Sequence, residues 1–261
     1  MPKVLFIGDI VGRPARSFIK KRLPQLRTDL SLDLVIANAE NSAGGSGLTA
    51  KIAGELREMG IDGITLGDHT WDQRGFEAEI DALEYVCRPA NVPNHCPGRH
   101  FLILECGGFR LGVFTVLGRQ WMKLQPDSFA LQTADRLLGK LADQTDGLVV
   151  EIHAEATAEK VALGWYLDGR VAAVVGTHTH VPTADAQLLP RSTGYLTDIG
   201  MTGPYQSCIG RDLQAVIASF LDGMPRKHSV AQHDVRLCGV ILNINADSGL
   251  CDHIERLEVR E

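Results

Sequence analysis

The sequence lacks the patterns that mark membrane proteins and binders of long nucleic acid. It contains no uninterrupted run of 18 apolar residues, so we do not expect a membrane-spanning helix. It contains no run of five like charges, and its formal net charge is −6. The basic surface that would hold a long nucleic acid is therefore missing. A small anionic partner remains possible if bound cations reverse the local field.

The six cysteines never form a C-x-x-C pair. This spacing argues against a zinc ribbon and against a thioredoxin-like redox motif. The N-terminal stretch "MPKVLFIGDIVG" lacks the features of a secretory signal, so we expect a cytoplasmic protein with reduced thiols. The glycine-rich "SAGGSGLT" is not followed by G-K-[ST] and is therefore not a Walker loop.

Hydrophobic patterning predicts an α/β fold. In the N-terminal half, short apolar strands alternate with amphipathic segments, which is typical of βαβ units and a mostly parallel sheet. Residues 17–30 should form a helix that bends or starts late because of Pro24, and residues 49–60 a helix capped by Thr49. After residue 100, glycine-centred turns predict hairpins at 100–118, 186–200 and 236–260. We expect packed sheets in one domain over residues 1–261.

Polar residues gather where the predicted strands end. In open α/β sheets, ligands bind beyond the carboxyl ends of the strands, so these side chains should converge. Each alone has an ordinary explanation, such as a turn or helix cap for an Asp, or a hydrogen-bonded structural role for a His. The pair His178-x-His180 is more specific, because positions i and i+2 of an extended chain face the same side. The set comprises Asp9, Glu40, Asn41, Asp68, His69, His153, His178 and His180.

These donors combine imidazole nitrogens with carboxylate and amide oxygens and include no thiolate. Such a mixture suits Mn, Fe or Zn in an open catalytic site. There are too many donors for one tetrahedral ion, whereas two ions sharing a bridging carboxylate would use them. Paired metal ions about 3.5–4 Å apart are an arrangement that promotes phosphoester hydrolysis.

The ordered fragments "GD", "AEN", "GDH", a His after a strand and "GTHTH" resemble the calcineurin-like metallophosphoesterase superfamily. The strings "LFIGDIVGRPAR", "AENSAGGSGLT", "HAEATAEKVALGWYLDGRVAAVVGTHTHVPTAD" and "TDIGMTGP" resemble its YmdB-like branch over nearly the whole chain. The resemblance implies a four-layer αββα sandwich of two mixed sheets flanked by helices. It also implies a di-iron or di-manganese centre, with iron the first expectation, and hydrolysis of small phosphodiesters such as 2′,3′-cyclic nucleotides.

The resemblance also assigns roles to individual residues. The first metal would be bound by Asp9, Asn41 and His180, and the second by Asp68, His153 and His178. Glu40 would bridge the two ions. Metal-bound hydroxide would attack phosphorus, and His69 would protonate the leaving oxygen, helped by a neighbouring carboxylate such as Asp68 or Asp72.

One position departs from the family pattern. The motif is usually Gly-Asn-His, whereas this chain has Gly67-Asp68-His69. A carboxylate should still bind metal, but it lowers the net charge of the site by one unit, so the metals should be less Lewis-acidic and anionic substrate less strongly held.

Several readings stay open from the sequence. The same site could serve a phosphomonoesterase, or a regulatory protein that binds metal with little turnover. Arg13, Arg88 and Arg119 could contact phosphate or base, or could be ordinary solvated loop residues. The stretches "GWYL" and "MTGPYQ" leave room for a homo-oligomeric interface.

Overall fold

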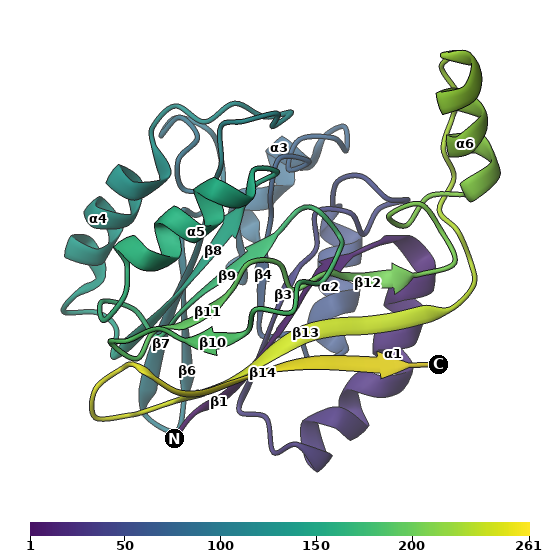
Figure 1. Ribbon diagram of the computed structural model, residues 1–261. Helices are drawn as coiled ribbons and strands as arrows, with labels where there is room; N and C mark the ends of the chain where they lie inside the picture. Colours follow the sequence, from purple (N-terminus) through teal and green to yellow (C-terminus); the bar gives the residue numbers. More distant parts are fainter.

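The chain folds into two mixed β-sheets stacked face to face, with helices on both outer surfaces (Figure 1). The computed structural model describes all residues, 1–261. In Figure 1, α1 and α2 lie on one side of the molecule and α4 and α5 on the other. The expected four-layer αββα sandwich is therefore confirmed.

The first sheet has eight strands in the order β2-β12-β13-β1-β3-β4-β5, with β14 paired to β13. Strands β1, β3, β4 and β5 run parallel, as the βαβ pattern predicts, and β13 is antiparallel to β1. The strands are β1 (Lys3–Ile7), β2 (Asp9–Ile10), β3 (Leu34–Asn38), β4 (Gly63–Thr65), β5 (Val86–Cys87), β12 (Met201–Pro204), β13 (Val235–Ile244) and β14 (Cys251–Arg260).

The second sheet has six strands in the order β10-β11-β9-β8-β7-β6. The hairpins predicted across Gly107-Gly108, between residues 186 and 200, and near the C-terminus are confirmed as β6–β7, β10–β11 and β13–β14. The strands are β6 (Leu102–Cys106), β7 (Phe109–Leu117), β8 (Gly147–His153), β9 (Ala173–Thr177), β10 (Gln187–Leu188) and β11 (Gly194–Leu196).

Three apolar cores hold the four layers together. Alternation along β1 illustrates this, because Leu5 and Ile7 pack under α1 and α2 while Val4 and Phe6 pack between the two sheets. A third core joins α4 and α5 to the second sheet. The helices are α1 (Gly12–Asp29), α2 (Ala50–Glu58), α3 (Phe76–Glu79) with a 3-10 turn (Ile80–Ala82), α4 (Ala130–Leu141), α5 (Thr157–Tyr166) and α6 (Leu213–Asp222). No helix is both long and apolar enough to span a membrane.

The first helix differs from its prediction. α1 begins at Gly12, directly after the strand end, and continues through Pro24 to Asp29, so the late start expected from Pro24 is wrong. Pro24 lies on the exposed side of α1. Water can therefore satisfy the carbonyl group that the missing proline N–H leaves free. The predicted Thr49 cap of α2 is confirmed, since its side chain accepts a hydrogen bond from the Ile52 N–H at 3.3 Å.

Exposed apolar surface lies partly where the sequence did not predict it. Met201–Pro204 of the "MTGPYQ" stretch are buried in β12 and cannot contribute to a self-interface, which stays a prediction. Trp165 and Tyr166 of "GWYL" are exposed as expected. The sequence reading missed α6, which projects from the body in Figure 1 and has no buried residue.

Candidate metal centre

The predicted site residues meet where strands of both sheets end. Donor atoms of Glu40, Asp68, His153 and His178 all lie within 4.8 Å of one another, close enough to hold one metal ion. Nε2 of His153 is 3.1 Å from Oε1 of Glu40 and 3.2 Å from Oδ1 of Asp68. Nδ1 of His178 is 3.1 Å from Nε2 of His153.

A second group of donors borders the first. The side chain of Asn41 lies 3.3 Å from Oε1 of Glu40 and 3.2 Å from Nε2 of His180. The same His180 nitrogen lies 3.8 Å from Oδ1 of Asp9. Glu40 therefore lies between the two groups.

The chemistry of these donors fits cations. Asp9, Glu40 and Asp68 are buried, and none of them forms an ion pair with a Lys or Arg side chain. Buried carboxylates need a compensating charge, because desolvation strongly disfavours an isolated anion. Oδ1 of Asp9 is buried without any hydrogen-bond partner. A bound metal ion would supply both the charge and the missing partner.

The same environment shifts the pKa values of Asp9 and Asp68 in opposite directions. Burial raises the pKa of Asp9 to about 7, against the opposing charge of His153. Burial would also raise the pKa of Asp68, but hydrogen bonds from His153 and His178 outweigh it and hold that pKa well below its usual range. Asp68 is therefore held as an anion, in keeping with a role as a ligand.

Buried hydrogen bonds orient the His153 ring. The hydroxyl of Thr177 donates to Oε1 of Glu151 at 2.7 Å, so it accepts from Nδ1 of His153 at 2.8 Å. Burial would lower the pKa of His153, but the charge of Glu40 and hydrogen bonds to Asp68 and Glu40 raise it, so without a metal Nε2 carries a proton and donates to these carboxylates. Once a metal displaces that proton, Nε2 faces the same carboxylates with a free lone pair. An imidazole fixed in this way presents its lone pair to a metal, as outer partners of metal-binding histidines commonly arrange.

Close packing explains the glycine of the "GDH" motif. A Cβ atom added at Gly67 would lie 2.3 Å from Nε2 of His153 and 2.5 Å from Oε2 of Glu40. Such contacts are far inside van der Waals range, so any side chain at Gly67 would displace the donors. The backbone can pass this close to His153 and Glu40 only because glycine has no side chain.

The loop that carries His178 and His180 is strained. Both residues have positive φ, 94° and 65°, a region that residues other than glycine seldom occupy. Such strain persists only when surrounding contacts determine it. Nδ1 of His180 lies 2.9 Å from the carbonyl oxygen of Ile209, and Nε2 of His178 lies 3.2 Å from Oε2 of Glu155. These contacts fix which nitrogen of each ring faces the site.

The buried pair of Asp198 and Lys160 anchors the same loop. The buried carboxylate of Asp198 accepts hydrogen bonds from the backbone N–H and the hydroxyl of Thr179, the residue between the two histidines, at 3.2 and 2.7 Å. It also forms a 2.7 Å ion pair with Lys160, and both side chains are 1% exposed. Because Lys160 lies on α5, just after His153, the pair links two separate donor segments.

His69 lies at the edge of the donor group. Its backbone N–H donates to Oε2 of Glu40 at 2.8 Å, and its Nδ1 is 2.7 Å from Oδ2 of Asp72. Asp72 also accepts from the Ser46 hydroxyl and from Nζ of Lys123. Burial would raise the pKa of Asp72, but hydrogen bonds from Lys123, Ser46 and His69 keep it below the usual value.

Two of the three arginines that could contact phosphate or base, or could be ordinary loop residues, make other contacts in the structure. Arg88 is buried and donates to the carbonyl oxygens of Pro97 and Pro89, so it supports its own loop. The Arg119 guanidinium stacks 4.5 Å above the Phe129 ring.

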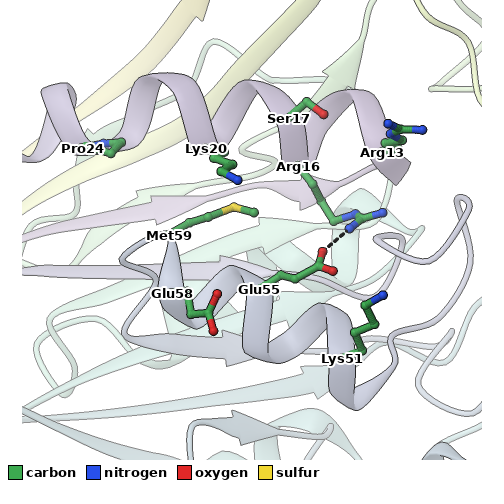
Figure 2. A pocket seen from close by; sticks show the side chains of 9 residues that line it. All are labelled: Arg13, Arg16, Ser17, Lys20, Pro24, Lys51, Glu55, Glu58 and Met59. Carbon is green, nitrogen blue, oxygen red and sulfur yellow. Dashed lines mark hydrogen bonds and ion pairs between the residues drawn. The ribbon is translucent and has the colours of Figure 1, made fainter.

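Arg13 lines a cavity of about 910 Å³ between α1 and α2. Figure 2 shows Arg13 at one end of this groove, with Arg16 paired to Glu55 beside it. None of the predicted metal ligands lines this groove. Most of the donors are buried, and only His178 and His180 among the predicted ligands are partly exposed.

The eight site residues predicted from the sequence lie close together in the structure, but the residues that orient them were not predicted. Lys160 and Asp198 lie within the quoted strings "HAEATAEKVALGW" and "TDIGMTGP". A lysine at helical spacing among apolar residues, and an aspartate directly after the short apolar stretch "GYLT", were the signals available. The ion pair between Lys160 and Asp198 is evident only in the folded structure.

Comparisons with known proteins agree with this geometry. The sequence model of the family described as "YmdB-like protein" matches residues 5–257. The chain is 42% identical to the 2′,3′-cyclic-nucleotide 2′-phosphodiesterase of Bacillus subtilis, over 99% of this chain and 97% of that protein. Its structure matches that of a phosphatase from Mycoplasma pneumoniae with a TM-score of 0.93 and 32% identity, covering 99% and 93% of the two chains.

More distantly, the fold is similar to that of the 5′-nucleotidase of Candida albicans, with a TM-score of 0.57 at 13% identity over 99% of this chain and 51% of that one. This likeness concerns the fold alone. The expected resemblance is thus confirmed by the family match and by relatives that align over nearly their whole length. The chain belongs to the YmdB-like family.

Proposed function

We propose that this protein is a metal-dependent phosphodiesterase that hydrolyses small phosphodiesters such as 2′,3′-cyclic nucleotides. The observation that carries the proposal is the pair of adjoining donor groups around Glu40, with three buried carboxylates that have no Lys or Arg counter-charge. The name of the Bacillus subtilis relative supports the substrate class.

Two metal ions would be held by these residues. Asp9, Asn41 and His180 would bind one, Asp68, His153 and His178 the other, and Glu40 would bridge them. Imidazole and oxygen donors without thiolate suit iron, and otherwise manganese. When bound, such ions neutralise phosphate charge and lower the pKa of a coordinated water to roughly 7.

His69 would protonate the leaving oxygen. Its Nδ1 is bonded to Asp72, which leaves Nε2 as the nitrogen free to face substrate. In the protonated ring, Nδ1–H donates to the carboxylate of Asp72 while Nε2–H is transferred to the alkoxide as the P–O bond breaks. The contact between the His69 backbone and Glu40 keeps this ring next to the metal donors.

A phosphomonoesterase is the second candidate, because the similar Mycoplasma pneumoniae structure is described as a phosphatase. Both activities would use the same donors and differ in substrate. A 2′,3′-cyclic nucleotide compared with p-nitrophenyl phosphate as a monoester separates them. A regulatory protein with little turnover would bind the metals and hydrolyse neither.

The first test is metal content per chain together with cyclic-nucleotide hydrolysis. We expect close to two equivalents of iron or manganese, and loss of both metal and activity in Asp9→Asn. Asp168→Asn is a matched control, since Asp168 is also a buried carboxylate but accepts the N–H of Arg191 away from the site. A protein that binds no metal after reconstitution would overturn the proposal.

A further inference from the structure

Trp121 combines two unfavourable properties on one residue. Its side chain is 80% exposed, although indole is among the largest apolar groups. Its φ is 58°, in the left-handed region where a bulky residue is a genuine outlier. Strained residues of this kind cluster at ligand-binding sites, where the strain serves the function. Neither property has an evident structural benefit.

The loop that carries Trp121 is anchored on one side to α5 and its preceding strand. The N–H of Gly118 donates to the carbonyl oxygen of His153 at 3.0 Å. The N–H of Gln120, next to Trp121, donates to Oε2 of Glu159 at 3.3 Å. The chain therefore leaves the His153 side of the metal centre immediately before Trp121.

On the other side, the loop is anchored to the GDH segment. The backbone N–H of Lys123 donates to Oδ2 of Asp68 at 3.0 Å, and its Nζ lies 2.6 Å from Oδ1 of Asp72. Between Trp121 and Lys123, the Met122 side chain is buried. Trp121 thus occupies the apex of a short bridge between the two sides of the candidate metal centre.

Chain geometry limits how far Trp121 can be from the reacting phosphate. Two residues span at most about 7 Å, so the Trp121 Cα lies within that distance of Lys123, whose N–H contacts Asp68. In a nucleotide, the ribose separates base from phosphate by a similar length. A phosphate at the metal donors would therefore leave the base within reach of the Trp121 segment.

We propose that Trp121 forms a subsite that stacks on the base of a nucleotide substrate. This inference rests on the proposed function and specifies its substrate class further: a diester that carries a flat aromatic base. Stacking on an aromatic side chain tolerates every base because each has a π-face. The subsite should therefore accept purines and pyrimidines and should discriminate nucleotides from diesters without a base.

The test compares Trp121→Ala and Trp121→Phe on two substrates, 2′,3′-cyclic AMP and a base-free diester without any aromatic ring, methyl ribofuranoside 2,3-cyclic phosphate. We expect Trp121→Ala to raise KM for the nucleotide about 5- to 100-fold, with kcat little changed and the base-free diester unaffected. Trp121→Phe should retain much of the affinity. Trp165→Ala is the matched control, because Trp165 is also exposed, at 56%, but lies at the far end of α5.

Equal losses on both substrates, or an unchanged nucleotide KM in Trp121→Ala, would overturn the subsite. If the wild type hydrolyses neither substrate, the proposed function fails separately, and binding still tests Trp121. Adenosine 2′-monophosphate should quench tryptophan fluorescence of the wild type but not of Trp121→Phe, which retains Trp71 and Trp165. Absence of quenching in the wild type would also overturn the subsite.

Discussion

Nδ1 of His69 lies 2.7 Å from Oδ2 of Asp72. The backbone N–H of the same residue donates to Glu40, which places His69 beside the metal donors. A carboxylate in this position orients the ring by accepting the Nδ1–H, which leaves Nε2 to face the site.

The first prediction concerns this pair. His69→Ala should keep its metal and lose about 10²–10⁴-fold in rate for an alkoxide leaving group, because the proton donor is gone. Asp72→Asn should lose less, since an amide oxygen can still accept from Nδ1. Steady-state hydrolysis of 2′,3′-cyclic AMP measures both effects.

A substrate with p-nitrophenolate as leaving group is the internal control, because that anion departs without a proton. Equal loss on both substrates would assign His69 to binding or structure instead of proton transfer. Full activity of His69→Ala on the cyclic nucleotide would exclude it as the proton donor.

The second prediction concerns Asp68, where the family resemblance leads us to expect Asn. Asp68→Asn removes one negative charge beside His153 and His178 and should lower KM for an anionic diester about 3- to 10-fold. One amide oxygen can replace one carboxylate oxygen, so metal should remain bound. Metal analysis and diester kinetics at fixed ionic strength check both outcomes, and an increased KM would contradict the charge argument.

The third prediction concerns the support beneath the His178–His180 loop. Thr179→Val removes the hydroxyl donated to Asp198 and should weaken metal binding about 10- to 100-fold, as changes to outer partners of metal ligands do. Lys160→Met should have at least that effect, because it leaves a buried carboxylate unpaired. Competition with a chelator measures the affinity.

Arg170→Met is the control for this series, since it removes a 2.6 Å ion pair with Asp135 that is largely exposed. Its metal affinity should equal that of the wild type. If Thr179→Val binds metal as tightly as the wild type, the strained loop does not depend on Asp198.

The fourth prediction concerns acid stability. Burial, with the nearby charge of Arg88, lowers the pKa of His100 from 6.5 to about 4. The folded state therefore favours the neutral ring, and its contribution to stability is complete above pH 6.5 and is lost as the pH falls toward 4. Because His100 is partly exposed, the loss should not exceed about 1 kcal/mol.

His100→Gln should remove this pH dependence while keeping an acceptor for Nη2 of Arg88, which donates to His100 at 3.0 Å. Urea unfolding of metal-free protein at pH 7.5 and 4.5 gives the comparison. The wild type should lose more stability between the two pH values than the variant, and equal losses would exclude His100 as a contributor.

The amino-acid sequence determined the alternation of strands and helices, most hairpins and the candidate metal donors. It could do so because these features are local: strands and helices follow from periodicity, and turns from glycine. The donors follow short apolar strands such as "VIAN", which places them at one edge of a sheet before any tertiary contact is known.

Tertiary structure alone decided what orients those donors and what surrounds them. Lys160 and Asp198 are 38 positions apart, and Lys123 and Asp68 are 55 apart, so no local pattern joins them. Pro24 was misjudged for a related reason, because its effect depends on which side of α1 faces water. The exposure of Trp121 could not be predicted either, because burial is set by packing across the whole fold and not by the hydrophobicity of the residue. The neighbours of Trp121 are hydrogen-bonded to Glu159 and Asp68, which lie on two segments far away in the sequence.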